Sequence, residues 1–245
     1  MNKNIDLCVS AHSFQEEELR DKVTVVIDVL RASSTIVTAL NSGAKGIIPV
    51  QDMDAAGKIS INLDSPNFLL CGEKDGKKIE GYDLGNSPAE YSPETVKGKT
   101  IIFKTSNGTQ AIKRSTMSKE ILVGTFLNLQ SVLNRLREVE NDIVLVCAGW
   151  KGRLALEDML CAGNIAHELT GGHLPGDASD GVKVAFGLYE KFGNDIENTL
   201  RNSNHAKRLD HITENDDISY CSQLNTMDVL PTLKEGIITD ANGKK

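Results

Sequence analysis

The stretch from Val23 to Thr35, VTVVIDVLRASST, constrains the fold of this chain more than any other. Five of its first seven residues are apolar and the run is rich in β-branched side chains, which predicts a strand buried on both faces. Asp28 ends the run, Arg31 follows three residues later, and Ser33 or Ser34 can cap the next helix. A carboxylate, a guanidinium and free backbone N–H groups therefore gather where a strand meets a helix. Ligands bind at that edge of open α/β sheets, and helix N-termini attract phosphate.

Apolar runs and helical periodicities alternate along the rest of the chain. Strands are predicted over residues 5–9, 23–29, 47–50, 68–71, 100–103, 121–123, 143–147, 229–230 and 237–238. Helices are predicted over 32–41, 53–63, 107–115, 128–140, 154–169 and 177–192, with helix and loop over 194–224. This alternation predicts an α/β fold.

Three segments repeat one pattern: VVIDVLRASST, IIFKTSNGTQA and IVLVCAGWKGR. Each is an apolar strand, a small or polar turn, then a helix, which indicates a possible internal βα duplication and a sheet whose strand ends share one rim. Residues 72–94 are the longest stretch without strong periodicity, and their apolar side chains predict an ordered loop. Because no linker or low-complexity run interrupts the chain, residues 1–245 are predicted to form a single α/β domain.

The composition restricts the partners and the compartment. A net charge of −7 does not favour nucleic acid or an anionic membrane, so a phosphate ligand would need a local positive site. No apolar run approaches the roughly 20 residues of a membrane span, and the first ten residues lack a signal-peptide pattern. The five cysteines are widely spaced with no C-x-x-C pair, so we expect a reducing, cytoplasmic compartment.

A second candidate site follows the predicted strand 100–103. It comprises Lys104, Thr105, Ser106, Asn107, Gly108 and Thr109. These residues offer three hydroxyls, an amide, a cation and a glycine, and small residues let backbone N–H groups approach an anion. The alternative is an Asn-Gly hairpin turn, but a hairpin needs a second strand and residues 110–112 look helical.

Each remaining candidate has a structural alternative. Asp28 and Arg31 are an ion pair in one reading and catalytic groups in the other. Glu73 directly follows the strand 68–71, with a solvent-facing loop charge as its alternative. Asn86 and Ser87 belong to residues 83–88, for which an Asx-turn and helix cap are equally favoured.

Acidic residues also begin the predicted helix 154–169. Glu157 and Asp158 fall in its first turn, where acidic side chains interact favourably with the helix dipole. On that basis alone, a structural role is favoured over a role in a site. The five histidines, His205 among them, show no metal-ligand spacing and are expected at the surface or in the core. No G-x-S-x-G, P-loop or G-x-G-x-x-G motif is present.

The residues together predict an anion site with carboxylates nearby and no Ser or Cys nucleophile. Carboxylates repel phosphate unless a divalent cation intervenes, and Mg²⁺ uses one or two carboxylates plus phosphate oxygens. We therefore expect metal-assisted phosphoryl transfer or hydrolysis, with Asp28, Glu73 and Asp158 as metal ligands. Arg31 would hold the phosphoryl oxygens, and Asp28 would hold the metal or attack phosphorus.

Several motifs occur in an order and spacing that resembles the 2-phosphosulfolactate phosphatase family over about residues 1–231. They are VIDVLRA at 26–32, GYDLGNSP at 81–88, NGT at 107–109, CAG at 147–149, LED at 156–158 and CAG at 161–163. The resemblance implies Mg²⁺-dependent hydrolysis of 2-phosphosulfolactate to sulfolactate and phosphate, a step of coenzyme M biosynthesis. It also implies a three-layer α/β/α fold with a mainly parallel or mixed sheet, and a homodimer.

Two rival functions stay open at this point. One is a phosphatase of broader phospho-hydroxyacid range, and the other is a non-catalytic protein that binds a phosphorylated acid. Phosphate release separates the enzymes from the binding protein, and a panel of phosphorylated hydroxy acids separates the two enzymes.

Overall fold

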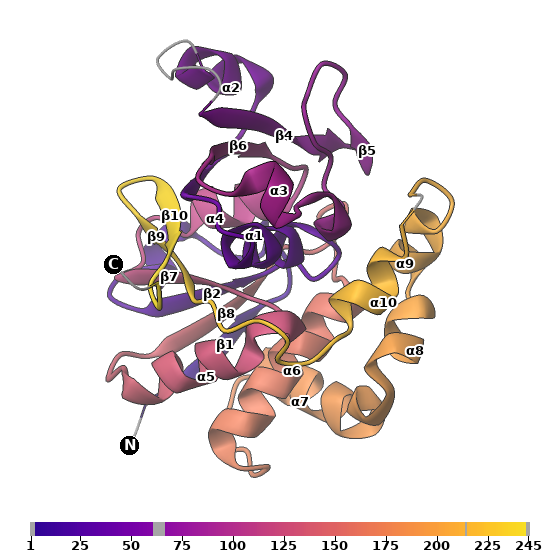
Figure 1. Ribbon diagram of the computed structural model, residues 1–245. Coiled ribbons are helices and arrows are strands. Elements are labelled where there is room, and N and C mark those ends of the chain that lie inside the picture. The colour runs from indigo at the N-terminus through magenta and orange to yellow at the C-terminus, as the bar shows by residue number, and fades with distance from the viewer. Residues whose placement is uncertain (1–2, 61–66, 214, 244–245) are drawn as a thin grey trace.

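The computed structural model describes residues 3–60, 67–213 and 215–243. These residues form a central mixed sheet of ten strands (Figure 1). The strands are β1 (Ile5–Cys8), β2 (Val23–Ile27), β3 (Gly46–Val50), β4 (Phe68–Lys74), β5 (Lys77–Lys78), β6 (Thr100–Lys104), β7 (Glu120–Gly124), β8 (Ile143–Cys147), β9 (Pro231–Lys234) and β10 (Ile237–Asp240). Their order across the sheet is β1-β8-β2-β7-β9-β10-β3-β6-β4-β5.

The sheet consists of two parallel groups joined by an antiparallel hairpin. β1, β8, β2 and β7 run parallel to one another, as do β3, β6 and β4. β9 and β10 form the hairpin, which pairs with β7 through Leu122 and Thr232 and with β3 through Ile47 and Ile238. All residues of β2 and β8 are buried, as expected for parallel strands covered on both faces.

Helices cover both faces of the sheet, which confirms the predicted α/β/α layering (Figure 1). They are α1 (Ala32–Asn41), α2 (Met53–Ser60), α3 (Pro93–Val96), α4 (Gly108–Arg114), α5 (Leu129–Glu138), α6 (Leu156–Thr170), α7 (Asp180–Phe192), α8 (Ile196–Arg201), α9 (Asn204–Leu209) and α10 (Asp217–Cys221). None of these described helices is long and apolar enough to span a lipid bilayer.

The core explains how the layers meet. Side chains of α5, α6 and α7 pack on the outer face of the β1–β8–β2–β7 group. α1 and α4 lie between the two strand groups, where Ile36 and Ile112 share one cluster with Val26 of β2 and Phe103 of β6. α2 covers the far side through Ala56. The sheet therefore bends around α1 and α4, as Figure 1 shows.

This bend brings together the turns that follow β2, β6 and β8. Ala148 N donates to Ile27 O at 2.7 Å and joins the turns after β8 and β2. A Cβ atom placed on Gly108 would lie 2.5 Å from Ala32 Cβ and 2.7 Å from Asp28 Oδ2, so only glycine fits there. The three strand–turn–helix segments thus meet at one place, although β6 belongs to the other strand group.

Four sequence predictions need correction or lie partly outside the described residues. Ser33 and Ser34 do not cap α1, because Arg31 is its N-cap and Ser33 Oγ accepts the Asp28 N–H instead. The strand predicted at 229–230 begins at Pro231. The helix predicted over 53–63 is described only to Ser60. Residues 72–94 are ordered as predicted, but they include the end of β4, β5 and α3.

Candidate active site

A cavity of about 220 Å³ lies where these strand ends meet. The predicted site residues that line it are Asp28, Arg31, Glu73, Asn86, Thr105, Ser106 and Asn107. Residues that the sequence did not single out complete the lining, among them Trp150, Lys151, His205, Arg208 and Leu209. A larger hollow of about 940 Å³ lies at the opposite ends of β1 and β8, but none of the predicted residues lines it. The smaller cavity is therefore the candidate site.

Asp28 is buried at the end of β2, with 7% of its surface exposed. Its Oδ1 accepts the N–H of Ala32 at 3.2 Å. Burial raises the pKa of Asp28 to about 6, and the charges of Glu73 and Glu157 add to the rise, while His205 and the Ala32 N–H oppose it. A carboxylate whose ionised form is disfavoured in this way gains from a bound cation.

Asp158, in the first turn of α6, is equally buried but plays a different part. Its Oδ1 accepts the N–H of Val29 at 2.9 Å, and its Oδ2 accepts the N–H of Gly149 at 3.0 Å. Burial and the nearby Asp28 and Glu157 raise the pKa of Asp158 well above its usual range. Asp158 is not among the lining residues, and it ties the turn after β2 to the turn after β8.

Glu73 is buried as well, so the solvent-facing alternative for this residue is wrong. Its Oε1 accepts the N–H of Ser106 at 2.5 Å. Its Oε2 accepts the N–H of Gly76 at 2.6 Å and the hydroxyl of Ser106 at 3.2 Å. Glu73 therefore joins the β4–β5 turn to the turn that follows β6, and its carboxylate lines the cavity between them.

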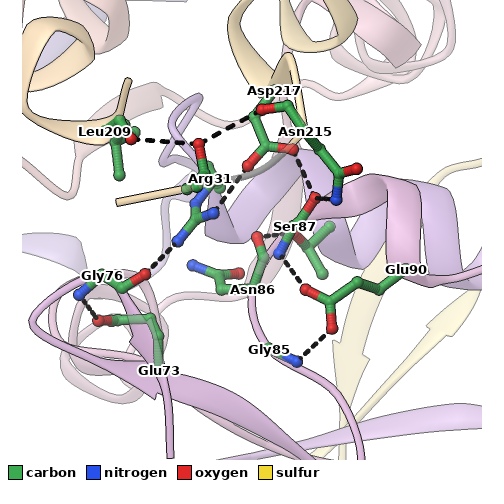
Figure 2. Close-up of polar contacts among 12 residues, drawn as sticks. Arg31, Glu73, Gly76, Gly85, Asn86, Ser87, Glu90, Leu209, Asn215 and Asp217 are labelled. Atoms are coloured by element: carbon green, nitrogen blue, oxygen red, sulfur yellow. Dashed lines mark hydrogen bonds and ion pairs between the residues drawn. The ribbon is translucent and has the colours of Figure 1, made fainter. Parts of the chain in front are cut away.

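Arg31 forms its ion pair with Asp217 rather than with Asp28 (Figure 2). Nη1 donates to Asp217 Oδ2 at 2.7 Å, and Nη2 donates to the carbonyl of Gly76 at 2.8 Å. The side chains of Arg31 and Asp217 are 4% and 1% exposed. No ion pair joins Arg31 to Asp28 among the described residues, so the structural pair between them, one of the two readings of the sequence, is wrong.

Three of the residues 104–109 line the cavity, and the others lie outside its lining. Thr105, Ser106 and Asn107 line the cavity, whereas Lys104 points Nζ to the Glu73 carbonyl at 3.4 Å. Thr109 lies behind the lining, where its N–H donates to Thr105 Oγ1 at 3.1 Å. α4 begins at Gly108, so the alternative of an Asn-Gly hairpin is wrong.

Asn86 and Ser87 also differ in whether they line the cavity. Asn86 lines the cavity, and its buried Oδ1 has no hydrogen-bond partner among the described residues. Ser87 does not line the cavity; its hydroxyl donates to Asp217 Oδ1 at 2.5 Å and accepts from Asn215 Nδ2 at 3.0 Å. Asn86 is thus part of the lining, while Ser87 is linked to the lining residue Arg31 through Asp217.

His205 lines the cavity, although the sequence places it with the surface or core histidines. His205 Nδ1 lies 2.7 Å from Oε1 of the buried Glu157, and the His205 ring stacks on Trp150 with centroids 5.2 Å apart. An ionised Glu157 fixes the proton on Nδ1 and leaves Nε2 for a bound ligand. Glu157 and His205 are 48 residues apart, with no motif that connects them.

Lys151 and Arg208 add positive charge to the same cavity. Arg208 Nη2 donates to the carbonyl of Asp75 at 2.7 Å, which attaches α9 to the β4–β5 turn. Together with Arg31, these two side chains form the local positive site that a phosphate ligand requires in a protein of net charge −7.

The donors that face the cavity fit a hard divalent cation. Asp28 and Glu73 supply two carboxylates to the lining, and Asn86 supplies an amide whose buried Oδ1 has no hydrogen-bond partner among the described residues. Mg²⁺ takes one or two carboxylates and completes its shell with water and phosphate oxygens. Within the described ranges, no three His, Cys, Asp or Glu side chains are grouped as a metal site of their own. The fit therefore depends on oxygens from a ligand and solvent.

Comparisons with known proteins identify the family of the chain. A family model described as 2-phosphosulpholactate phosphatase matches residues 8–236. A protein of Caldanaerobacter subterraneus subsp. tengcongensis named probable 2-phosphosulfolactate phosphatase is 41% identical over 228 residues, 93% of this chain and 94% of the relative. Relatives of the same name from Thermotoga petrophila and Clostridium tetani are 43% and 39% identical, over 88% and 96% of this chain and 91% and 99% of their own lengths. The chain belongs to the 2-phosphosulfolactate phosphatase family.

Proposed function

We propose that this protein hydrolyses 2-phosphosulfolactate to sulfolactate and phosphate, with Mg²⁺ as its cofactor. Membership of the family makes it a phosphoric monoester hydrolase. The observation that carries the proposal is the single cavity lined by two carboxylates, an unpartnered amide oxygen and a buried guanidinium. That combination is what phosphoryl transfer requires for charge neutralisation and orientation.

Asp28 and Glu73 would hold the ion, with Asn86 as the third donor. When bound, Mg²⁺ supplies Lewis-acid polarisation of the phosphoryl group and offsets its charge against the carboxylates. Asp158 would instead support Asp28 from behind the lining, because it does not line the cavity and its two oxygens tie the turn after β2 to the turn after β8.

Arg31 would bind the phosphoryl oxygens. Two of its N–H groups are used by Asp217 and Gly76, and no further acceptor contacts the guanidinium among the described residues. The remaining N–H groups match oxygens on which negative charge grows during transfer, in a site with little solvent. Asp28 would act either as a metal ligand only or as a nucleophile toward phosphorus.

The other cations of the lining suit the rest of the substrate. 2-Phosphosulfolactate carries a carboxylate and a sulfonate besides its phosphate, and Lys151 and Arg208 line the same cavity as Arg31. A protonated His205, with Nδ1 held by Glu157, would donate a hydrogen bond from Nε2 to the leaving oxygen. A role in coenzyme M biosynthesis and a homodimer belong to the same proposal and rest on the family resemblance. The cytoplasmic location that belongs to it rests on the widely spaced cysteines.

A substrate panel tests the proposal. Purified protein is mixed with 2-phosphosulfolactate and with phosphorylated hydroxy acids that lack the sulfonate, and phosphate release is measured with Mg²⁺ and with excess chelator. We expect release with 2-phosphosulfolactate, loss of release in chelator, and recovery when Mg²⁺ is added back.

Other outcomes identify the rival functions. Equal turnover of all phosphorylated hydroxy acids would support a phosphatase of broader range. Tight binding of the panel without any phosphate release would support the non-catalytic binding protein. Full activity in chelator would contradict the role of Mg²⁺.

A further inference from the structure

Arg31 is held from two sides by parts of the chain that are distant in sequence. Asp217, at the start of α10, is 186 residues away, and Gly76 lies in the β4–β5 turn. Figure 2 shows the guanidinium between the two acceptors. Because the two bonds leave different terminal nitrogens, they fix the plane of the guanidinium as well as its position.

Asp217 is itself fully engaged. Its Oδ2 accepts from Arg31 and its Oδ1 accepts from the Ser87 hydroxyl, which also accepts from Asn215 (Figure 2). The side chain of Asp217 is 1% exposed, and Asp217 does not line the cavity. Asp217 therefore does not contact a ligand, and it acts on a ligand only through Arg31.

Stability alone is a weak reason for such a pair. The desolvation of two charges offsets most of their attraction, so a buried ion pair often adds little to folding. What the pair does supply is one fixed orientation of a guanidinium beside a reacting group. Without a charge on Asp217, the guanidinium would turn to other carboxylates near it, and Asp28 and Glu73 line the same cavity.

We propose that Asp217 is a positioning residue for the phosphatase reaction: it orients Arg31 toward the phosphoryl group and keeps Arg31 from pairing with Asp28 or Glu73. This inference rests on the proposed function and extends it to a residue outside the cavity. It also gives the C-terminal helix α10 a part in the active site.

A double-mutant cycle tests the inference. The variants are Asp217→Asn, Arg31→Lys and the double variant, each measured for kcat, KM and melting temperature with 2-phosphosulfolactate and Mg²⁺. We expect Asp217→Asn to lower kcat about tenfold to a hundredfold, the range for lost supporting residues. The kcat of the double variant should equal that of Arg31→Lys within about twofold, because without the Arg31 guanidinium there is no group left for Asp217 to orient.

Asp216→Asn is the matched control. Asp216 is the adjacent residue, pairs with Arg201 at the surface and caps α10, a position that Asn also suits. It should keep wild-type kcat. Losses that multiply in the double variant, or an Asp217→Asn protein with normal kcat and only a lower melting temperature, would overturn the inference.

A second readout does not depend on turnover. The affinity for inorganic phosphate in the presence of Mg²⁺, measured by calorimetry, should fall several-fold in Asp217→Asn and stay unchanged in Asp216→Asn. If the wild type releases no phosphate from any compound, the proposed function fails while this titration still decides the role of Asp217.

A third variant covers the case in which Asp217→Asn does not fold. Ser87→Ala removes one hydrogen bond to Asp217 and keeps its charge. We expect a folded Ser87→Ala protein to lose several-fold in kcat, and wild-type kcat together with wild-type phosphate affinity would overturn the inference.

Discussion

The cavity has two walls, and they are held in place by different kinds of contact. The strand wall consists of Asp28, Glu73 and Thr105–Asn107, which lie at the carboxyl ends of β2, β4 and β6. The helix wall, His205, Arg208 and Leu209, belongs to α9. Asp28 accepts a backbone N–H four residues away. Glu73 accepts one three residues away and one from Ser106, in the turn after the neighbouring strand β6. His205 instead depends on the side chain of Glu157, 48 residues away. Local backbone contacts form with their strand, but distant side-chain contacts form only when the whole fold closes.

This difference suggests a division of work. The strand wall carries the groups that would meet the metal ion and the phosphoryl group. The helix wall carries Arg208, which would bind an anionic group of the substrate, and His205, which would contact the leaving oxygen. Substitutions on the strand wall should therefore affect kcat most strongly.

Asp28→Asn should lower kcat by a hundredfold or more. It removes either a metal ligand or a nucleophile, while its amide oxygen still accepts from Ala32 N. The measurement is kcat with 2-phosphosulfolactate beside the melting temperature. A folded Asp28→Asn protein with wild-type turnover would end the catalytic interpretation of the strand wall.

His205→Asn should lower kcat about tenfold, with a smaller change in KM, because the leaving oxygen loses its hydrogen bond. His211→Asn is the control, since His211 is exposed in the segment that follows α9. An aryl phosphate whose leaving group needs no such bond should be hydrolysed almost equally by wild type and His205→Asn. An equal loss with both substrates would contradict this role for His205.

The same Asp28→Asn change should raise stability at neutral pH in the presence of chelator. The pKa of Asp28 is raised from 3.8 to about 6 in the folded protein, so its ionisation costs stability as pH rises from about 4 to 6, and the cost persists above. At 1.36 kcal/mol per pKa unit this is about 3 kcal/mol at most.

Thermal unfolding at pH 8 and pH 4 checks this expectation. The variant should melt several degrees above wild type at pH 8, and the difference should shrink toward pH 4. A variant that melts lower than wild type at pH 8 would show that the Asp28 carboxylate supports the fold. Added Mg²⁺ should raise the melting temperature of the wild type more than that of the variant and so reduce the difference at pH 8, because the ion stabilises the ionised carboxylate.

The sequence predicted the strand wall because its signals are local. The helix 32–41 agrees with α1 at both ends, and the apolar runs before Asp28, Glu73 and Thr105 are strands β2, β4 and β6. A buried strand followed by polar residues is visible in a window of ten residues. The same local pattern misled in one respect, since the Ser33 hydroxyl bonds to Asp28 N rather than capping α1.

The helix wall could not be predicted for a physical reason. His205 and Asp217 lie in a polar stretch whose helices are only five or six residues long, too short to show a clear apolar face. Their partners, Glu157 and Arg31, are fixed by packing between distant segments. Likewise, the sequence around Asp158 does not indicate that its oxygens accept the N–H groups of Val29 and Gly149 and that the residue lies outside the cavity lining.

The β9–β10 hairpin has a consequence for how the chain is made. It is the only link between β7 and β3 among the described strands, and it is translated after all of the others. The roughly 90 residues between β8 and β10 take about 5–20 s to synthesise. During this time β7 and β3 each have an open edge where the hairpin will later pair. An open edge is a template for pairing with another chain. Nascent chains that stall before residue 231 should therefore be the main source of aggregated or proteolysed protein.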